Sequence, residues 1–407
     1  MVKTPELFLE NLIARKLREQ GITAPKKLAG KLASHVLNGK GEPFRYRGKA
    51  PTENVTLTVT AKDTDDLIKD LDRFCENSIP KLIPAFAQRI SKSTLKHLKA
   101  KWAEEDISQS LDLAGFRERL EERWGKPLGQ LRMLLTMSRE WCQTVHERET
   151  RLKKHKQKQL REILIRLLAR ACQVTDEIIC LLENGFADGA MARWRTLHEI
   201  AVVAAVISQH GEDIAERYLA HQAVESKRAM DKYIKCCALL GYKPLSAREQ
   251  GKIVRAYDQT LGKYGKPFKS DHGWAAVHLK KDKPSFADLE EEAGRAAMRS
   301  YYQMGNDNIH AGVKSMFIRL GLLEDYTGLL AGRSNAGLTD PGQNTAHTLT
   351  QLSVLVCLSE PKLDDLVAAE MMKALRDKIP KSFRRADTRL RSDAKEHRQA
   401  VPNKQSN

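Results

Sequence analysis

The sequence ADGAMARWRTLHE occupies residues 187–199 and runs directly into the apolar stretch IAVVAAVI at residues 200–207. This stretch is too short to span a membrane, which takes about 20 residues, so it indicates a helix in a protein core. The same helix carries two arginines, a histidine and a glutamate just before the stretch. Because a charge on an apolar helical face is costly unless it is paired, these side chains require partners.

The chain around this helix is helical by its pattern. From residue 63 onward, apolar residues recur at spacings of three and four, which is typical of helices that bury one face. We predict an all-α fold in which a multi-helix bundle forms the main domain at residues 161–379. The helices expected in it cover residues 161–183, 186–209, 212–240, 246–261, 286–302, 309–320, 345–358 and 364–379.

A small α+β accessory unit is expected at residues 1–125. Two short amphipathic helices are predicted in it, at residues 6–20 and 25–37. The segment VTLTVT at residues 55–60 alternates strictly and is rich in β-branched residues, so it predicts a strand. A single strand cannot form a sheet, and we expect it to pair with residues 44–47 as one short hairpin.

Charge defines two further segments. The sequence HERETRLKKHKQKQLR at residues 146–161 has hardly an apolar residue on any face, so we predict a long charged linker helix over residues 126–160. The alternative to a solvated linker is that the charged surface of this segment contacts phosphate groups. The tail at residues 380–407 is basic and poor in apolar residues. We predict that it is partly disordered, mainly beyond Arg391.

The chain as a whole is strongly basic. Its 407 residues carry a formal net charge of +17 at pH 7, which favours a polyanionic partner, with RNA or DNA the main candidates. An inert solvated surface is the alternative. The seven cysteines include no CxxC pair, and this usage is typical of a reducing cytoplasm. We therefore expect a cytoplasmic protein with no signal peptide and no contact with a membrane.

Motifs for cofactors and metals are missing from the sequence. It has no GxxxxGK[ST] loop, no GxGxxG after a strand and no HExxH, so nucleotide hydrolysis, dinucleotide binding and zincin chemistry are not indicated. His272 and His278 share a loop without a nearby set of carboxylates or thiolates, which makes a zinc site there a poor hypothesis. We predict no cofactor and no metal.

Arg195 and Glu199 are four residues apart, so they lie on one face of the helix and can pair directly. One interpretation is a structural salt bridge within the helix. The other is that Glu199 orients the guanidinium toward a phosphate or carboxylate, or acts as a base. Asn306 and His310 belong to a second polar cluster, NDNIH at residues 306–310. We predict that these four residues converge as catalytic residues, with His310 as the titratable base.

Other residues are predicted to surround this set. Arg193 and His198 lie on the same helix but point away from Glu199, and they are secondary catalytic candidates. A loop at residues 262–284, rich in Gly, Lys and aromatic residues, is long enough to suggest function or disorder. We predict that Lys269 and Trp274 in this loop bind substrate beside the catalytic cleft.

The chain resembles a widespread bacterial family, the domain of unknown function 5677, over about residues 160–330. The residues that carry the likeness are GxxxGAxxxxRTLHE at residues 185–199, Tyr218, Trp274, and the series Tyr301-Tyr302-x-x-x-Asn306-x-x-x-His310-Ala311. The resemblance implies an all-α bundle and a bacterial origin but no established activity. It adds Tyr302 as a secondary catalytic candidate and Tyr218 as a substrate-binding candidate. This sequence departs from the family pattern with Asn306 in place of a serine and with His198 inside the first motif.

A weaker resemblance is to HEPN ribonucleases, helical bundles of bacterial defence and toxin systems. Their motif has an arginine, four to six residues and then a histidine, and Arg193-x-x-x-x-His198 is similar. The resemblance implies cleavage of RNA without a metal, in which histidine moves the proton of the 2′-hydroxyl and arginine stabilises the phosphorane. Trp194 departs from the motif, which usually has a polar residue after the arginine.

The sequence leaves three functional hypotheses. The first is a protein directed at nucleic acid, specifically a metal-independent ribonuclease acting in phage defence or as a toxin. The second is a non-enzymatic binding or scaffold protein that contacts RNA or DNA through residues 148–170 and 378–398, with Arg195 and Glu199 as a structural pair. The third is an enzyme for a small anionic ligand. Expected protein partners are a second copy of the chain or a protein encoded nearby.

Overall fold

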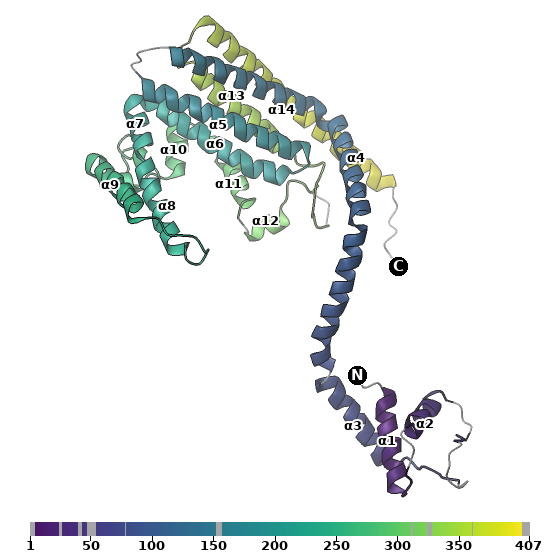
Figure 1. Ribbon diagram of the computed structural model, residues 1–407. Helices are drawn as coiled ribbons and strands as arrows, with labels where there is room; N and C mark the ends of the chain where they lie inside the picture. The colour runs from purple at the N-terminus through teal and green to yellow at the C-terminus, as the bar shows by residue number, and fades with distance from the viewer. Residues whose placement is uncertain are drawn as a thin grey trace. The chain divides into compact units, whose positions relative to one another are not determined.

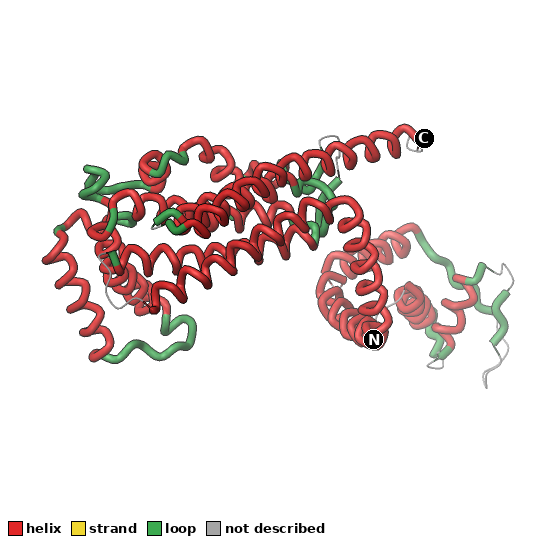
Figure 2. Tube along the Cα trace, turned by 90° about the horizontal axis from the view of Figure 1, so that it is seen from above, coloured by secondary structure: helices red, strands yellow, loops and turns green. Residues whose placement is uncertain are grey.

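The computed structural model describes residues 5–23, 27–39, 43–46, 54–77, 79–151, 157–310, 312–323, 328–359 and 361–400. Within these ranges the chain forms helices and loops and no strand (Figures 1 and 2), which confirms the all-α prediction. The chain divides into two compact units, residues 1–111 and residues 112–407. No helix of the described residues is long and apolar enough to cross a membrane.

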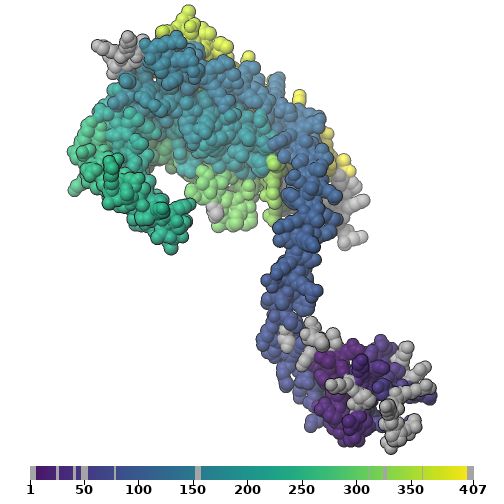
Figure 3. Space-filling view, in the orientation of Figure 1, coloured from purple at the N-terminus to yellow at the C-terminus, as the bar shows by residue number. Residues whose placement is uncertain are grey.

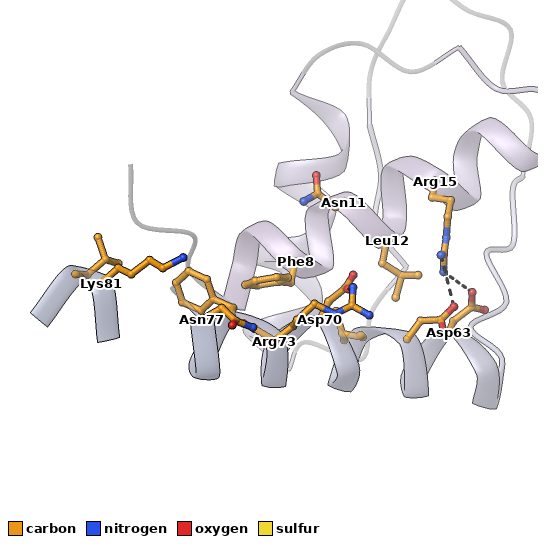
Figure 4. Close-up of a pocket in the computed structure, with 13 residues that line it drawn as sticks. Phe8, Asn11, Leu12, Arg15, Asp63, Asp70, Arg73, Asn77 and Lys81 are labelled. Atoms are coloured by element: carbon orange, nitrogen blue, oxygen red, sulfur yellow. Dashed lines mark hydrogen bonds and ion pairs between the residues drawn. The ribbon is translucent and has the colours of Figure 1, made fainter. Parts of the chain in front are cut away.

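Unit 1 contains helices α1 (Pro5–Glu19), α2 (Leu28–Leu37), α3 (Ala61–Asn77) and the first part of α4 (Ile79–Arg151). Its small apolar core joins α1 to α2 and includes the buried residues Ile13, Leu17, Ala29 and Ala33. A groove of about 780 Å³ lies in this unit, lined by residues of α1, α3 and the start of α4 (Figure 4). Its walls carry both acidic and basic side chains, so it shows no preference for one charge of ligand.

The prediction of a hairpin in unit 1 is wrong for the described residues. Residues 55–60 form no helix and no strand, and the described part of the expected partner, residues 44–46, is also irregular; residue 47 lies outside the described residues. Of the three apolar residues in the segment, Leu57 packs on the α1–α2 core while Val55 and Val59 stay exposed. Thr60 instead lies directly before α3. Its backbone N–H and its hydroxyl both donate hydrogen bonds to the Asp63 carboxylate in the first turn of that helix.

Unit 2 is a helical bundle in which long helices lie side by side (Figures 1 and 2). These helices are α5 (Lys158–Glu183), α6 (Ala187–His210), α13 (Thr339–Cys357), α14 (Leu363–Ala400) and the part of α4 from residue 112 onward. Helix α6, which carries the sequence ADGAMARWRTLHE, packs on both α5 and α13. Its alanines at 190, 201 and 204 are fully buried, and such small side chains let neighbouring helices approach closely.

Short elements connect these long helices. They are α7 (Glu212–Ala220), α8 (Gln222–Cys236), α9 (Ala247–Tyr264), η1 (Lys266–Lys269), η2 (Gly273–Ala275), α10 (Phe286–Glu292), η3 (Ala296–Met298), α11 (Arg299–Asp307) and α12 (Val313–Phe317). The helix predicted over residues 286–302 is interrupted. Gly294 ends α10 with a φ of +63°, a conformation that favours glycine, and α11 then begins at Arg299.

The boundary between the two units differs from the boundary that the charge pattern predicted. The described parts of the predicted linker, residues 126–151 and 157–160, belong to unit 2, where Leu128, Leu131 and Val145 are buried. Arg148 in the polar stretch forms an ion pair with the buried Asp365 at 2.8 Å. The polar pattern here therefore belongs to a helix that forms an ion pair with α14 through Arg148. Residues 152–156 lie outside the described residues.

The basic tail also differs from its prediction. Residues 380–400 continue α14 as a helix, although residues 401–407 lie outside the described residues. One face of this helix is apolar, and its residues Ile379, Phe383 and Ala386 are buried in the bundle core. Burial of this face stabilises the helix although its other faces are basic. Pro380 lies inside this helix and is buried there.

Candidate functional site

Arg195, Glu199 and Tyr302 form a hydrogen-bonded cluster between α6 and α11. Nη2 of Arg195 donates to the Tyr302 hydroxyl at 2.8 Å, and that hydroxyl donates to Oε1 of Glu199 at 2.8 Å. Arg195 and Glu199 also pair directly, with Nη2 and Oε1 3.1 Å apart. The Arg195 guanidinium carbon lies 4.7 Å from the centroid of the Tyr302 ring, in the range of a cation–π contact.

The close approach of α11 to α6 depends on Gly305. A Cβ atom at this position would lie 3.2 Å from Cβ of Arg195 and 3.3 Å from the carbonyl oxygen of Met191. These distances are tighter than ordinary contacts between carbon atoms, which are about 3.5–4.0 Å. The missing side chain therefore lets Tyr302, one turn earlier, reach over Arg195.

The cluster is open to solvent and has unused hydrogen-bonding groups. The side chains of Arg195 and Glu199 are 25% and 37% exposed. Nε of Arg195 and Oδ1 of Asn306 are buried and make no hydrogen bond to another described residue. Because buried polar atoms are costly to leave unpaired, these two atoms are positions that a ligand or water would fill.

A second, buried polar group lies behind Tyr302. Nε2 of His198 and Oε1 of Glu290 are hydrogen-bonded at 2.9 Å, and both side chains are 1% exposed. The other oxygen of Glu290 accepts from Nη1 of Arg299 at 2.5 Å. The His198 ring stacks on Trp194 and lies 5.9 Å from the Tyr302 ring. Burial lowers the pKa of His198, with Glu290 partly opposing the effect.

His272 is a further histidine on which the charge of Glu199 acts. Burial lowers its pKa, while the charges of Asp271 and, more weakly, Glu199 raise it. Its ring centroid lies 6.2 Å from that of Phe286, which in turn stacks on the Tyr302 ring at 4.8 Å. His272 is half-buried. The lowered pKa favours the neutral imidazole at pH 7, which can act as a base.

The structure does not bring His310 into this cluster. The chain leaves α11 after Asp307, before His310 is reached, and the His310 side chain is exposed. Among the described residues, no hydrogen bond or ion pair joins its ring to Arg195 or Glu199. The cluster that the sequence predicted around His310 therefore contains Tyr302 instead, and Asn306 lies on the same helix as Tyr302 with its Oδ1 buried and unpaired among the described residues.

The other predicted residues are distributed over both core and surface. Arg193 pairs with Glu177 of α5, so it points away from Arg195 and is not on a common face with His198. Trp274 is buried and packs edge-on against Tyr218, with ring centroids 5.1 Å apart. These two aromatic residues belong to the bundle core. Lys269 is exposed, and its carbonyl accepts a hydrogen bond from Arg228.

Glu290, Arg299, Phe286 and, as a catalytic candidate, His272 are residues that the sequence alone did not predict. A weak signal was available for Glu290. It is one of several consecutive acidic residues at 290–292, and a buried histidine such as His198 needs a partner. Nothing in the sequence separates Glu290 from its neighbours, because only the packing of α10 on α6 selects it. Among the described residues, no group of three or more His, Cys, Asp or Glu side chains is placed to hold a metal ion.

The depressed pKa of His198 predicts how folding stability depends on pH. The folded protein keeps His198 neutral, whereas the unfolded chain binds a proton at the usual histidine pKa of about 6.5. The free energy of unfolding is therefore expected to be highest above pH 6.5 and to fall as the pH drops below it. Urea denaturation at pH 7.5, 6.5 and 5.5 measures this dependence. A smaller decrease is expected in His198→Gln, and an equal decrease in that variant would assign the effect to other groups.

Residues 161–326 match the model of a family of unknown function (DUF5677), which is less than half of the chain. The match covers α6, α11 and all residues of the open cluster. No curated protein and no solved structure matches the chain. Because the family has no assigned activity, the function has to be argued from the geometry of the cluster.

Proposed function

We propose that this protein cleaves RNA by intramolecular attack of a 2′-hydroxyl, at the cluster of Arg195, Glu199 and Tyr302, with His272 as the base. The observation that carries the proposal is the hydrogen-bonded bridge from Arg195 through the Tyr302 hydroxyl to Glu199. The half-buried His272 is connected to this bridge through the Phe286 ring, which lies between the rings of His272 and Tyr302 in the series of ring contacts. Reactions of this type need a base for the 2′-hydroxyl and a fixed cation for the phosphorane. They need no metal, because the nucleophile belongs to the substrate.

Each residue has a separate role in the proposed reaction. His272 accepts the proton as the 2′-oxygen bonds to the adjacent phosphorus. Arg195 stabilises the charge on the phosphoryl oxygens. The bond from phosphorus to the 5′-oxygen breaks, the leaving oxygen takes a proton from solvent, and the products are a 2′,3′-cyclic phosphate and a 5′-hydroxyl. Glu199 and Tyr302 act as positioning residues that hold the guanidinium.

Two properties of the molecule favour a polymeric anion over a small enclosed ligand. The cluster is partly open to solvent, and the surface of unit 2 is hollowed between α8–α9 and α11–α12 (Figure 3). The formal net charge of +17 attracts nucleic acid from solution and concentrates it near the protein. A closed cavity would instead have favoured a small molecule.

The proposal is tested with purified protein in EDTA, using an RNA oligonucleotide and a DNA oligonucleotide of the same sequence. RNA is expected to be cleaved to fragments that end in 2′,3′-cyclic phosphate, and DNA is expected to remain intact because it lacks the nucleophile. Equal cleavage of DNA, or RNA fragments with 5′-phosphate ends, would contradict this chemistry. Binding of RNA without cleavage would support the scaffold hypothesis instead.

A further inference from the structure

A second guanidinium lies against the same tyrosine ring. The Arg299 guanidinium carbon is 5.3 Å from the centroid of the Tyr302 ring, and that of Arg195 is 4.7 Å from it. These two distances limit the separation of the two guanidinium carbons to about 10 Å at most. Two cations at this spacing can contact neighbouring phosphates of one strand, since these are one nucleotide apart.

Arg299 is fixed in place by a buried carboxylate. Its Nη1 donates to Oε2 of Glu290, and Glu290 is 1% exposed and also bonded to His198. The Arg299 side chain is nevertheless 40% exposed. Its Nε and Nη2 make no hydrogen bond to another described residue, so donors remain for a ligand. A guanidinium that is already held in one geometry loses little conformational entropy on binding.

We infer that Arg299 binds the phosphate next to the one that reacts at Arg195, so that the site takes a strand with at least two successive phosphates. This inference rests on the proposed function. It assigns a role to the buried group of His198 and Glu290, which holds Arg299 while Tyr302 holds Arg195. A substrate with a single phosphate would engage only the reacting position and is expected to be a poor substrate.

The experiment compares a ribodinucleoside monophosphate with the two trinucleoside diphosphates that extend it by one nucleotide, on the 5′ or the 3′ side. A hydrogen-bonded charge contact of this kind changes kcat/KM by about tenfold to a hundredfold. Wild-type protein is expected to prefer one of the two longer substrates by this factor. In Arg299→Gln the preference is expected to fall to about twofold or less. Arg139→Gln, which removes an exposed arginine of α4 that is also paired with a carboxylate, Asp176, is expected to keep it.

The outcomes separate this inference from the proposed function. If wild-type protein cleaves none of the three substrates and no longer RNA, the proposed function fails and the inference falls with it. If it cleaves all three at equal kcat/KM, or if Arg299→Gln keeps the full preference, only the inference is overturned. Should Arg299→Gln unfold at a lower temperature than wild type, Arg299→Lys is used, since it keeps a charged donor for Glu290 and should show an intermediate preference.

Discussion

Replacing Arg195 with alanine is expected to lower kcat/KM for RNA about 10³-fold, the loss that follows removal of a group that stabilises transition-state charge. The structure holds this guanidinium against both Tyr302 and Glu199. Arg195→Lys keeps the charge but not the planar fork of donors, so it is expected to recover only part of the activity. Both variants are measured by initial rates on the same RNA oligonucleotide.

Arg193→Ala is the matched control for this prediction. Arg193 lies on the same helix, its side chain is 27% exposed against 25% for Arg195, and it also pairs with a glutamate. Because its guanidinium points to α5, its loss should leave cleavage within about threefold of wild type, which is less than 1 kcal/mol of transition-state energy. Parallel purification also controls for contaminating nucleases. If Arg195→Ala and Arg193→Ala had the same activity, Arg195 would have no part in the reaction.

Replacing Glu290 with alanine is expected to lower the free energy of unfolding by about 3 kcal/mol, because removal of this buried carboxylate leaves two hydrogen-bonding partners unpaired, one of them buried. The change would leave the buried ring of His198 without its hydrogen bond and would free Arg299 from its anchor. It would also leave a cavity. Urea denaturation at pH 7.5 measures the loss.

Glu292→Ala tests whether burial causes this effect. Glu292 also bonds to a histidine, His210, at 2.8 Å, but its side chain is 37% exposed. Exposed pairs contribute about 1 kcal/mol or less, so this variant is expected to stay close to wild type. A loss of equal size in both variants would show that the position on α10, and not the buried pair, determines stability.

Local sequence rules were sufficient to predict α6 and the contact between Arg195 and Glu199. The predicted helix at residues 186–209 matches α6 to within one residue at each end, because the apolar run and Gly211 after it are local signals. The spacing of Arg195 and Glu199 by four residues predicted their contact, and the structure has it at 3.1 Å. Tyr302 was named only because of a family resemblance.

The remaining partners depend on tertiary packing that local rules cannot give. The cluster NDNIH suggested a helix start at residue 309, so His310 was expected to project toward α6. Asn306 and Asp307 instead finish α11, and His310 follows in a turn at the surface. His272 lies far along the chain from Arg195, in a segment that was predicted as an irregular loop. Short 3₁₀ helices and the burial of Phe268 and Trp274 order that segment.

The measurement that tests the account most directly uses a DNA oligonucleotide with a single ribonucleotide in its middle. Wild-type protein is expected to cut it once, on the 3′ side of the ribonucleotide, and His272→Gln to cut it about 10²-fold more slowly while showing the same circular dichroism spectrum. Scission at deoxynucleotides, or an unchanged rate in His272→Gln, would contradict the proposal that His272 activates a 2′-hydroxyl beside Arg195.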